Sequence, residues 1–349
     1  MISSRFRGEN VSSASTTITT NGGDQSEKTC SSSSSMRAIE AAVPYNSNPD
    51  LPLYTVDQVP PHLAENLYIH TGYRMNYSAG MCFRSVLALH NETFNVWTHL
   101  IGFVIFLIVS FVFSIGVLIP RLTDRPGDGS ETGGSSFPDT VSLLGFHWPT
   151  LSIFAVYSVS CLMCMLCSAA FHTLIPHNHP VIYRIAHTLD YFGITFLVVG
   201  SFLPMCYFCF ACKPHLRYIY LIMVSLFGVG GLVGPCFRRW TDPAYMCAKI
   251  TFYVCMVGSG LLPVCHIYLT LPSSATASVV QGLLLMMGLY GVGVMIYALK
   301  VPESLYPGEF DIYLSSHQLW HVFVLCAAVV HFFNCASMYI NFDKMALNC

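Results

Sequence analysis

Seven long apolar stretches decide what this chain can fold into. A helix needs roughly 20 consecutive apolar residues to cross the hydrocarbon core of a bilayer, which is about 30 Å thick. Only 10% of the 349 residues are charged, whereas an average soluble domain has about 25%. We therefore expect an all-α membrane protein built as a seven-transmembrane helix bundle. The predicted spans are 95–119, 147–174, 183–206, 216–236, 247–269, 278–299 and 316–340.

The rest of the chain is organised around this bundle. Residues 1–52 are rich in Ser and Thr and poor in large apolar side chains, which predicts a disordered cytoplasmic tail. Residues 53–92 mix aromatic and turn residues and end in a helically spaced run, so we expect an ordered interfacial segment with an amphipathic pre-helix at 82–90. Residues 93–341 make up the transmembrane domain, and 342–349 form a short lumenal or extracellular tail.

Charge sets the expected orientation and excludes one class of partner. The net charge of -2 provides no basic surface, so no nucleic-acid partner is expected. Lys and Arg residues close to the spans are more numerous on the side of the N-terminus, and the positive-inside rule therefore favours a cytoplasmic N-terminus. The residues on that side are Arg74, Arg84, Arg184, Arg238, Arg239, Lys249 and Lys300, against Arg121, Arg125, Lys213, Arg217 and Lys344 on the other.

Histidines at the ends of two spans indicate a metal site. His317 and His321 open the last span four residues apart, so they lie on one face of a helix. His172 ends the second span, and because alternate spans run in opposite directions, all three histidines reach the same side of the membrane. A polar side chain there costs free energy unless it is paired, ligated or hydrated. Three imidazoles with one position left for water are a familiar catalytic zinc arrangement.

Other polar residues on this side suggest what such a metal could do. Zinc lowers the pKa of a bound water to about 7. Asp190, which opens the third span, could hold or deprotonate that water, and Ser168 could hydrogen-bond beside it. A lipid ester or amide carbonyl would then be attacked. The alternative is a structural metal that only ties the second and seventh helices together. The first span opens with further polar residues on this side, Glu92, Asn95 and His99.

The remaining candidate ligands are better explained by packing. Two cysteine runs, 161/164/167 and 206/209/212, imitate metal-ligand spacing. Thiolate zinc sites normally lie on loops, however, and a small residue at every third position of a membrane helix usually packs against a neighbour. His331 lies deep in the last span, and we expect it to be packed and hydrogen-bonded.

Several motifs resemble a known family. Asn91–Leu100, Ser168–His172, Leu189–Tyr191 and the stretch from Pro302 through His317 to His331 are similar to the progestin and adipoQ receptor family, relatives of haemolysin-III-type proteins. The resemblance runs from about Leu53 to the end of the chain. It implies Zn2+ bound by His172, His317 and His321, with Ser168 and Asp190 beside it. The wider superfamily includes alkaline ceramidases, so a zinc-dependent lipid amidase is an alternative function, and the resemblance leaves open whether the chain is an enzyme.

Within this family, residues 53–60, 68–74, 164–168 and 315–321 most resemble the Golgi member that holds Raf kinase at the Golgi membrane. This implies a Golgi scaffold among membrane lipids that tethers Raf kinase on the cytoplasmic side and restrains MAP kinase signalling. Residues 307–311 are similar to the adiponectin receptors instead, which implies a plasma-membrane receptor for a lipid or hormone as a further alternative. The residues expected to contact the kinase are Asp57, Gln58, Tyr68, Tyr73 and Arg74.

Overall fold

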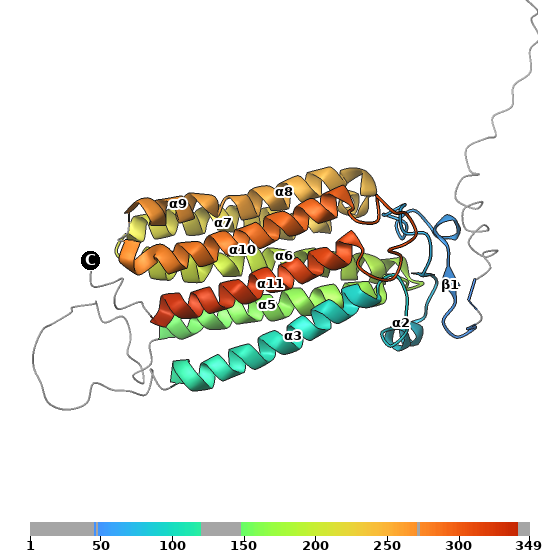
Figure 1. Ribbon diagram of the computed structural model, residues 1–349, viewed down its shortest axis with the longest axis horizontal. Coiled ribbons are helices and arrows are strands. Elements are labelled where there is room, and N and C mark those ends of the chain that lie inside the picture. Colours follow the sequence, from blue (N-terminus) through green and yellow to red (C-terminus); the bar gives the residue numbers. More distant parts are fainter. Residues whose placement is uncertain (1–44, 47, 120–147, 271–272, 341–349) are drawn as a thin grey trace, which may run out of the picture. The chain divides into compact units, whose positions relative to one another are not determined.

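In the computed structural model the long helices run side by side along one bundle (Figure 1). The predicted tail 342–349, most of the tail 1–52 and the long loop after the first span lie outside the described residues. The described residues are 45–46, 48–119, 148–270 and 273–340.

Seven helical segments in these described ranges are long and apolar enough to cross a membrane, which confirms the predicted seven-helix bundle. The first span is α3, Thr93–Phe113, extended by a π-helical turn at Ser114–Leu118. The other spans are α5 (Trp148–Leu174), α6 (Pro180–Cys209), α7 (Pro214–Val233) with a 3-10 turn at Gly234–Cys236, α8 (Met246–Gly258) with α9 (Leu261–Thr270), α10 (Ser273–Leu299) and α11 (Ser316–Ile340). Two further 3-10 turns, Arg238–Thr241 and Pro243–Tyr245, precede α8.

Prolines explain where several helices begin and break. Pro180 and Pro214 occupy the first helical positions of α6 and α7, where a fixed φ suits the helix and the missing N–H is not needed. The third span therefore starts three residues before its predicted start at residue 183. The predicted single fifth helix is two helices, because Pro263 cannot donate to the carbonyl of Ser259 and its ring would clash there. The chain breaks at Ser259 and Gly260.

Close packing of α5 against α6 depends on small residues. A Cβ atom added to Gly193 would lie 2.9 Å from the Cα atom of Cys164, so only glycine permits this approach. Cys161, Cys164 and Cys167 are buried free thiols in the α5 wall of the core. Deeper in the bundle, Tyr157 donates its hydroxyl to the backbone carbonyl of Ala328 on α11 at 2.9 Å. The side chains of α3 and α7 that face away from the bundle are large and apolar, as contact with lipid requires.

Residues 53–92, called the cap here, fold against the end of the bundle where α3 and α11 begin (Figure 1). Strand β1 (Leu53–Tyr54) pairs antiparallel with β2 (Tyr73–Arg74), and a 3-10 turn lies at Val56–Gln58. The pre-helix is α2 (Ala79–Ser85), which begins three residues earlier and ends five residues earlier than predicted. Its start is fixed by the Ser78 hydroxyl, which accepts from the Met81 N–H at 3.4 Å.

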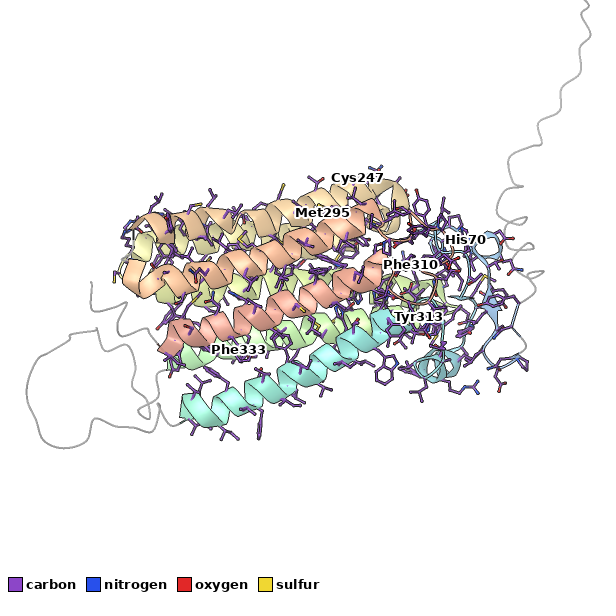
Figure 2. All side chains as sticks on the ribbon, viewed as in Figure 1. His70, Cys247, Met295, Phe310, Tyr313 and Phe333 are labelled. Carbon is purple, nitrogen blue, oxygen red and sulfur yellow. The ribbon has the colours of Figure 1, made fainter. Side chains whose placement is uncertain are left out.

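Two carboxylates in the loop between α10 and α11 hold the cap in place. Asp311 accepts the backbone N–H groups of His70 and Thr71, each at 2.8 Å, and the Thr71 hydroxyl at 2.7 Å. Figure 2 shows His70 of the cap near Phe310, the neighbour of Asp311. Glu303 is fully buried and accepts the Asn66 side-chain amide at 2.8 Å. Hydrogen bonds to a charged acceptor are among the stronger ones in proteins, so these contacts fix the cap firmly.

We predict that Asp311→Ala loosens the cap without unfolding the bundle. Two backbone N–H groups would lose a charged acceptor, which costs about 2 kcal/mol or more. Hydrogen exchange of the full chain in detergent should become faster over residues 66–74 and stay unchanged in α6. Asp57→Asn is the matched control, because Asp57 is an exposed cap carboxylate. Unchanged protection of 66–74 in Asp311→Ala would contradict this account of the cap.

Candidate metal centre

Two helices bring the three predicted histidines together at one end of the bundle. His172 lies in the last turn of α5, and His317 and His321 lie in the first two turns of α11. One ligand atom from each ring lies within 4.8 Å of the others. His172 and His321 are buried and His317 is half-buried. The i,i+4 spacing and the alternating direction of the spans place all three rings at one end of the bundle, and the packing of the helices brings them together.

The ring of His172 is oriented as a metal ligand would be. Its Nδ1 atom lies 2.8 Å from a carboxylate oxygen of Glu92, while its Nε2 atom is buried with no hydrogen-bond partner in the described part of the chain. A carboxylate on one ring nitrogen fixes the tautomer and directs the lone pair of the other nitrogen outward, as in many zinc sites. A metal ion at Nε2 would satisfy that buried atom. The residues present therefore fit Zn2+.

His321 shows the same division between its ring nitrogens. Its Nδ1 atom lies 3.2 Å from the backbone carbonyl of Asn95 and 3.4 Å from the Thr98 hydroxyl, both on α3. Donation of Nδ1–H to the carbonyl leaves Nε2 as the free ligand atom. His99 stacks on His321 with ring centroids 3.9 Å apart and planes 10° apart. Neither ring nitrogen of His99 has a hydrogen-bond partner among the residues described.

Asp190 and Ser168 lie beside the histidines and line a cavity of about 500 Å³. The cavity lies within the membrane-spanning part of the bundle, and His99, His317 and His321 form part of the same wall. Ser168 is buried and lines this cavity together with Asp190. Most of the remaining wall is apolar, with residues that include Leu197, Val198, Ile250, Leu284, Met287 and Val324.

Lys249 adds a positive charge to this wall. It lies at the start of α8, is 2% exposed, and its Nζ atom has no hydrogen-bond partner in the described structure. The ammonium lies 5.7 Å from the centre of the Tyr191 ring, which is a cation–π contact. In the sequence it is a single Lys in the first turn of an apolar span, a pattern that indicates the orientation of the span but no role in a site.

Glu92 is the site residue to which the sequence assigned no role. The sequence places it among the polar residues that open the first span, but its pairing with His172 requires the contact between α3 and α5. Its carboxylate also accepts the Asn95 side-chain amide at 2.5 Å. An acid directly before an apolar run was the available signal, and that signal does not say which helix the acid faces.

The five residues expected to bind a kinase separate into two groups. Asp57 and Tyr68 are exposed and Gln58 is half-buried, and the Thr55 hydroxyl, 2.6 Å from the Asp57 carboxylate, lowers the pKa of Asp57. Tyr73 and Arg74 are each only 3% exposed, which removes both side chains from any contact surface.

Arg74 has a structural role instead. Its guanidinium donates to the backbone carbonyl of His172 at 2.7 Å and to the Ser85 hydroxyl at 2.6 Å. Burial lowers the pKa of Arg74 to about 10, so the group is still charged at neutral pH and depends on these acceptors. Arg74 therefore joins the cap to the turn of α5 that carries a candidate metal ligand.

The fold and the site define a seven-helix membrane protein with a buried histidine triad. The model of the haemolysin-III-related family matches residues 87–332. The chain is 33% identical over 285 residues to the progestin and adipoQ receptor-like protein 1 of Caenorhabditis elegans, which covers 81% of this chain and 60% of that protein. It is 32% identical over 284 residues to the adiponectin receptor protein of Drosophila melanogaster, and the match covers 80% of this chain and 58% of that protein.

A plant relative extends the comparison. The heptahelical transmembrane protein 3 of Arabidopsis thaliana is 29% identical over 320 residues, with 85% of this chain and 90% of that protein covered. The chain thus belongs to the haemolysin-III-related family of progestin and adipoQ receptor type, and the family predicted from the motifs is confirmed. The chain spans about three fifths of the length of each of the two animal relatives.

We predict that Glu92→Gln weakens metal binding while the bundle stays folded. The amide no longer provides a charged acceptor for His172 Nδ1–H, and loss of such an outer partner typically lowers metal affinity by about 10- to 100-fold. Zinc affinity is measured by chelator competition on detergent-purified protein. Glu309→Gln, an exposed acid in the loop before α11, should match the wild type. Equal zinc affinities for wild type and Glu92→Gln would refute the role given to Glu92.

Proposed function

We propose that this membrane protein binds Zn2+ through His172, His317 and His321 and hydrolyses the amide bond of a membrane lipid, as a ceramidase does. One observation carries the proposal: candidate metal ligands and an acid share one wall of an apolar cavity inside the bundle. A volume of about 500 Å³ is within the range of ligand-binding pockets. An acyl chain fits such a wall, because it has no polar atoms that would have to be satisfied.

The residues of the chain have separate parts in this reaction. Zn2+, when bound, supplies a Lewis acid and makes water more acidic. Asp190 takes the proton of the attacking water as general base, and Ser168 lines the same cavity beside it. The apolar wall excludes bulk water and holds the acyl chain. Addition of water across the C–N bond releases a fatty acid and an amine, and the proton returns to the amine. Lys249 can hydrogen-bond an oxygen of the lipid headgroup.

We predict that two variants separate metal binding from catalysis. In His317→Ala/His321→Ala, both zinc content and ceramide turnover should fall to background, because two of three ligands are lost. In Asp190→Asn, zinc content should stay at about one per chain while release of free sphingosine falls at least about 100-fold, as removal of a general base does. Zinc is measured by elemental analysis and sphingosine on the same samples.

The outcomes of this experiment distinguish the hypotheses. A zinc-loaded wild type that releases no sphingosine would exclude the amidase and leave the metal as a structural tie between α5 and α11. A folded wild type without zinc would exclude the metal site as well. His266→Ala is the control, because His266 lies at the opposite end of the bundle, 2.8 Å from the Tyr220 hydroxyl.

The surface of the cap favours a second function. We propose that the cap tethers Raf kinase on the cytoplasmic face of the Golgi membrane and so restrains MAP kinase signalling. Leu67 is 70% exposed and the neighbouring Tyr68 is 39% exposed. Exposed aliphatic and aromatic side chains in an ordered segment favour protein contacts. Asp57 and Gln58 lie in the same cap, which is held to the bundle by Asp311 and Glu303.

We predict that Leu67→Ser/Tyr68→Ala reduces recruitment of Raf kinase to Golgi membranes by about tenfold or more, since loss of a central aromatic contact costs about 2 kcal/mol. Recruitment is followed by co-localisation of tagged kinase in cells that express the full chain. Asp190→Asn should recruit normally, because it leaves the cap intact. Tyr45→Ala, which also removes an exposed tyrosine, is the matched control. Normal recruitment by the double variant would rule out this surface.

A further inference from the structure

A histidine in the middle of the last span has a hydrogen-bonding atom that the described protein does not use. His331 of α11 is 1% exposed, and its Nδ1 atom is buried without a partner among the described residues. Its Nε2 atom lies 2.9 Å from the backbone carbonyl oxygen of Ser201 on α6. The sequence predicted a packed and hydrogen-bonded histidine here, and only one of its two ring nitrogens is hydrogen-bonded. An unpaired polar atom at this depth costs free energy.

The hydrogen bond to the Ser201 carbonyl determines what kind of group can pair with Nδ1 of His331. A carbonyl oxygen can only accept a hydrogen bond, so Nε2 must carry the proton. In a neutral imidazole the other nitrogen, Nδ1, is then an acceptor. The absent partner must therefore be a donor such as a hydroxyl group. A ketone or an ether could not fill this position.

Among the described residues, the neighbouring side chains do not supply that donor. The Tyr157 and His331 rings pack edge to face with their centroids 5.1 Å apart. The Tyr157 hydroxyl, however, already donates to the carbonyl of Ala328. The Cys335 thiol contacts Nε2 at 3.4 Å, which is the nitrogen already bonded to Ser201. Nδ1 remains the unsatisfied atom of this group.

His331 borders a small cavity next to the one at the metal centre. The small cavity has a volume of about 30 Å³ and includes Ser201 and Gly260 in its wall. This is room for about one water molecule or one hydroxyl-bearing carbon. The two cavities are neighbours because they share four wall residues, Val198, Val257, Met287 and Tyr290.

The cavity of about 500 Å³ at the metal centre is called the main cavity here. We propose that His331 is a specificity-determining residue, and that the lipid in the main cavity carries a hydroxyl group on its acyl chain that donates to Nδ1 of His331. This rests on the proposed function only in that the main cavity takes a lipid chain. It adds the chemical class of that lipid, a hydroxylated acyl chain. The small cavity then receives the carbon that bears the hydroxyl.

The distance between His321 and His331 along α11 predicts where on the acyl chain the hydroxyl lies. Ten residues separate His321 from His331, which is about 15 Å along a helix that rises about 1.5 Å per residue. An extended chain of single bonds advances about 1.2 Å per bond. About a dozen carbons therefore separate the group at the metal centre from the hydroxyl. A hydroxyl close to the carboxyl group would lie too far from His331.

Binding of three fatty acids to the full chain in detergent tests the proposal. The probes are stearate, stearate with a hydroxyl on its twelfth carbon, and stearate with a hydroxyl on its third carbon. Each competes with radiolabelled stearate, so the readout does not depend on turnover. The wild type should bind the mid-chain hydroxyl probe about tenfold more tightly than stearate, and the third-carbon probe should gain nothing from His331.

Two substitutions assign the effect to Nδ1. His331→Gln keeps an amide donor for the Ser201 carbonyl but has no acceptor at the position of Nδ1, so the preference should disappear while stearate affinity stays unchanged. His331→Asn places a carbonyl oxygen near the position of Nδ1 and should keep most of the preference.

Three results would overturn the proposal. Equal wild-type affinity for stearate and the mid-chain hydroxyl probe would mean that a water molecule satisfies Nδ1, while lipid binding in the main cavity would stand. A preference that survives in His331→Gln would place the hydroxyl elsewhere. Absence of binding by all three probes would remove the lipid from the main cavity, and the proposed function would fail together with this inference.

Discussion

Polar groups buried at one end of an apolar bundle must be satisfied by the protein or by something that it binds, because water is scarce there. The buried polar groups at this end of the bundle are therefore bonded to one another. The guanidinium of Arg74 is bonded to the backbone of His172, and the ring of His172 is bonded to Glu92. Among the described residues, the buried side-chain atoms left without a partner include both ring nitrogens of His99, Nε2 of His172 and Nζ of Lys249. His99 and Lys249 line the cavity. A metal or a ligand at the cavity would satisfy these atoms.

The cap and the metal centre are parts of one network. Glu303 accepts the Asn66 amide from the cap and also the backbone N–H of Ser316 at 2.7 Å, one residue before His317. Arg74 makes the corresponding connection to the residue His172 at the end of α5. A partner that moves the cap would therefore act on two of the three candidate ligands. This gives the two proposed functions, tethering at the surface and chemistry in the membrane, a common structural basis.

The cavity is defined by its two ends as much as by its apolar wall. At the cap end lie Asp190, Lys249 and the histidines of α11, and beyond its far end lies the unsatisfied nitrogen of His331. A fold shared by receptors and heptahelical proteins of animals and plants does not decide among functions. The positions of these few polar groups limit what can bind in the cavity, because in an apolar environment each of them requires a specific partner.

The sequence by itself determined the seven spans, the side of the membrane that the three histidines share, and the family. Those properties depend on local hydrophobicity and on the parity of the spans, and neither requires a knowledge of which helices touch. Only the tertiary structure showed that Glu92 faces His172, that Tyr73 and Arg74 are buried, and that one nitrogen of His331 has no partner among the described residues. The burial of Tyr73 and Arg74 depends on how the cap docks on the bundle, and the other two depend on how neighbouring helices are rotated against one another. The apolar pattern cannot fix that rotation, because in a membrane span nearly every face of the helix is apolar.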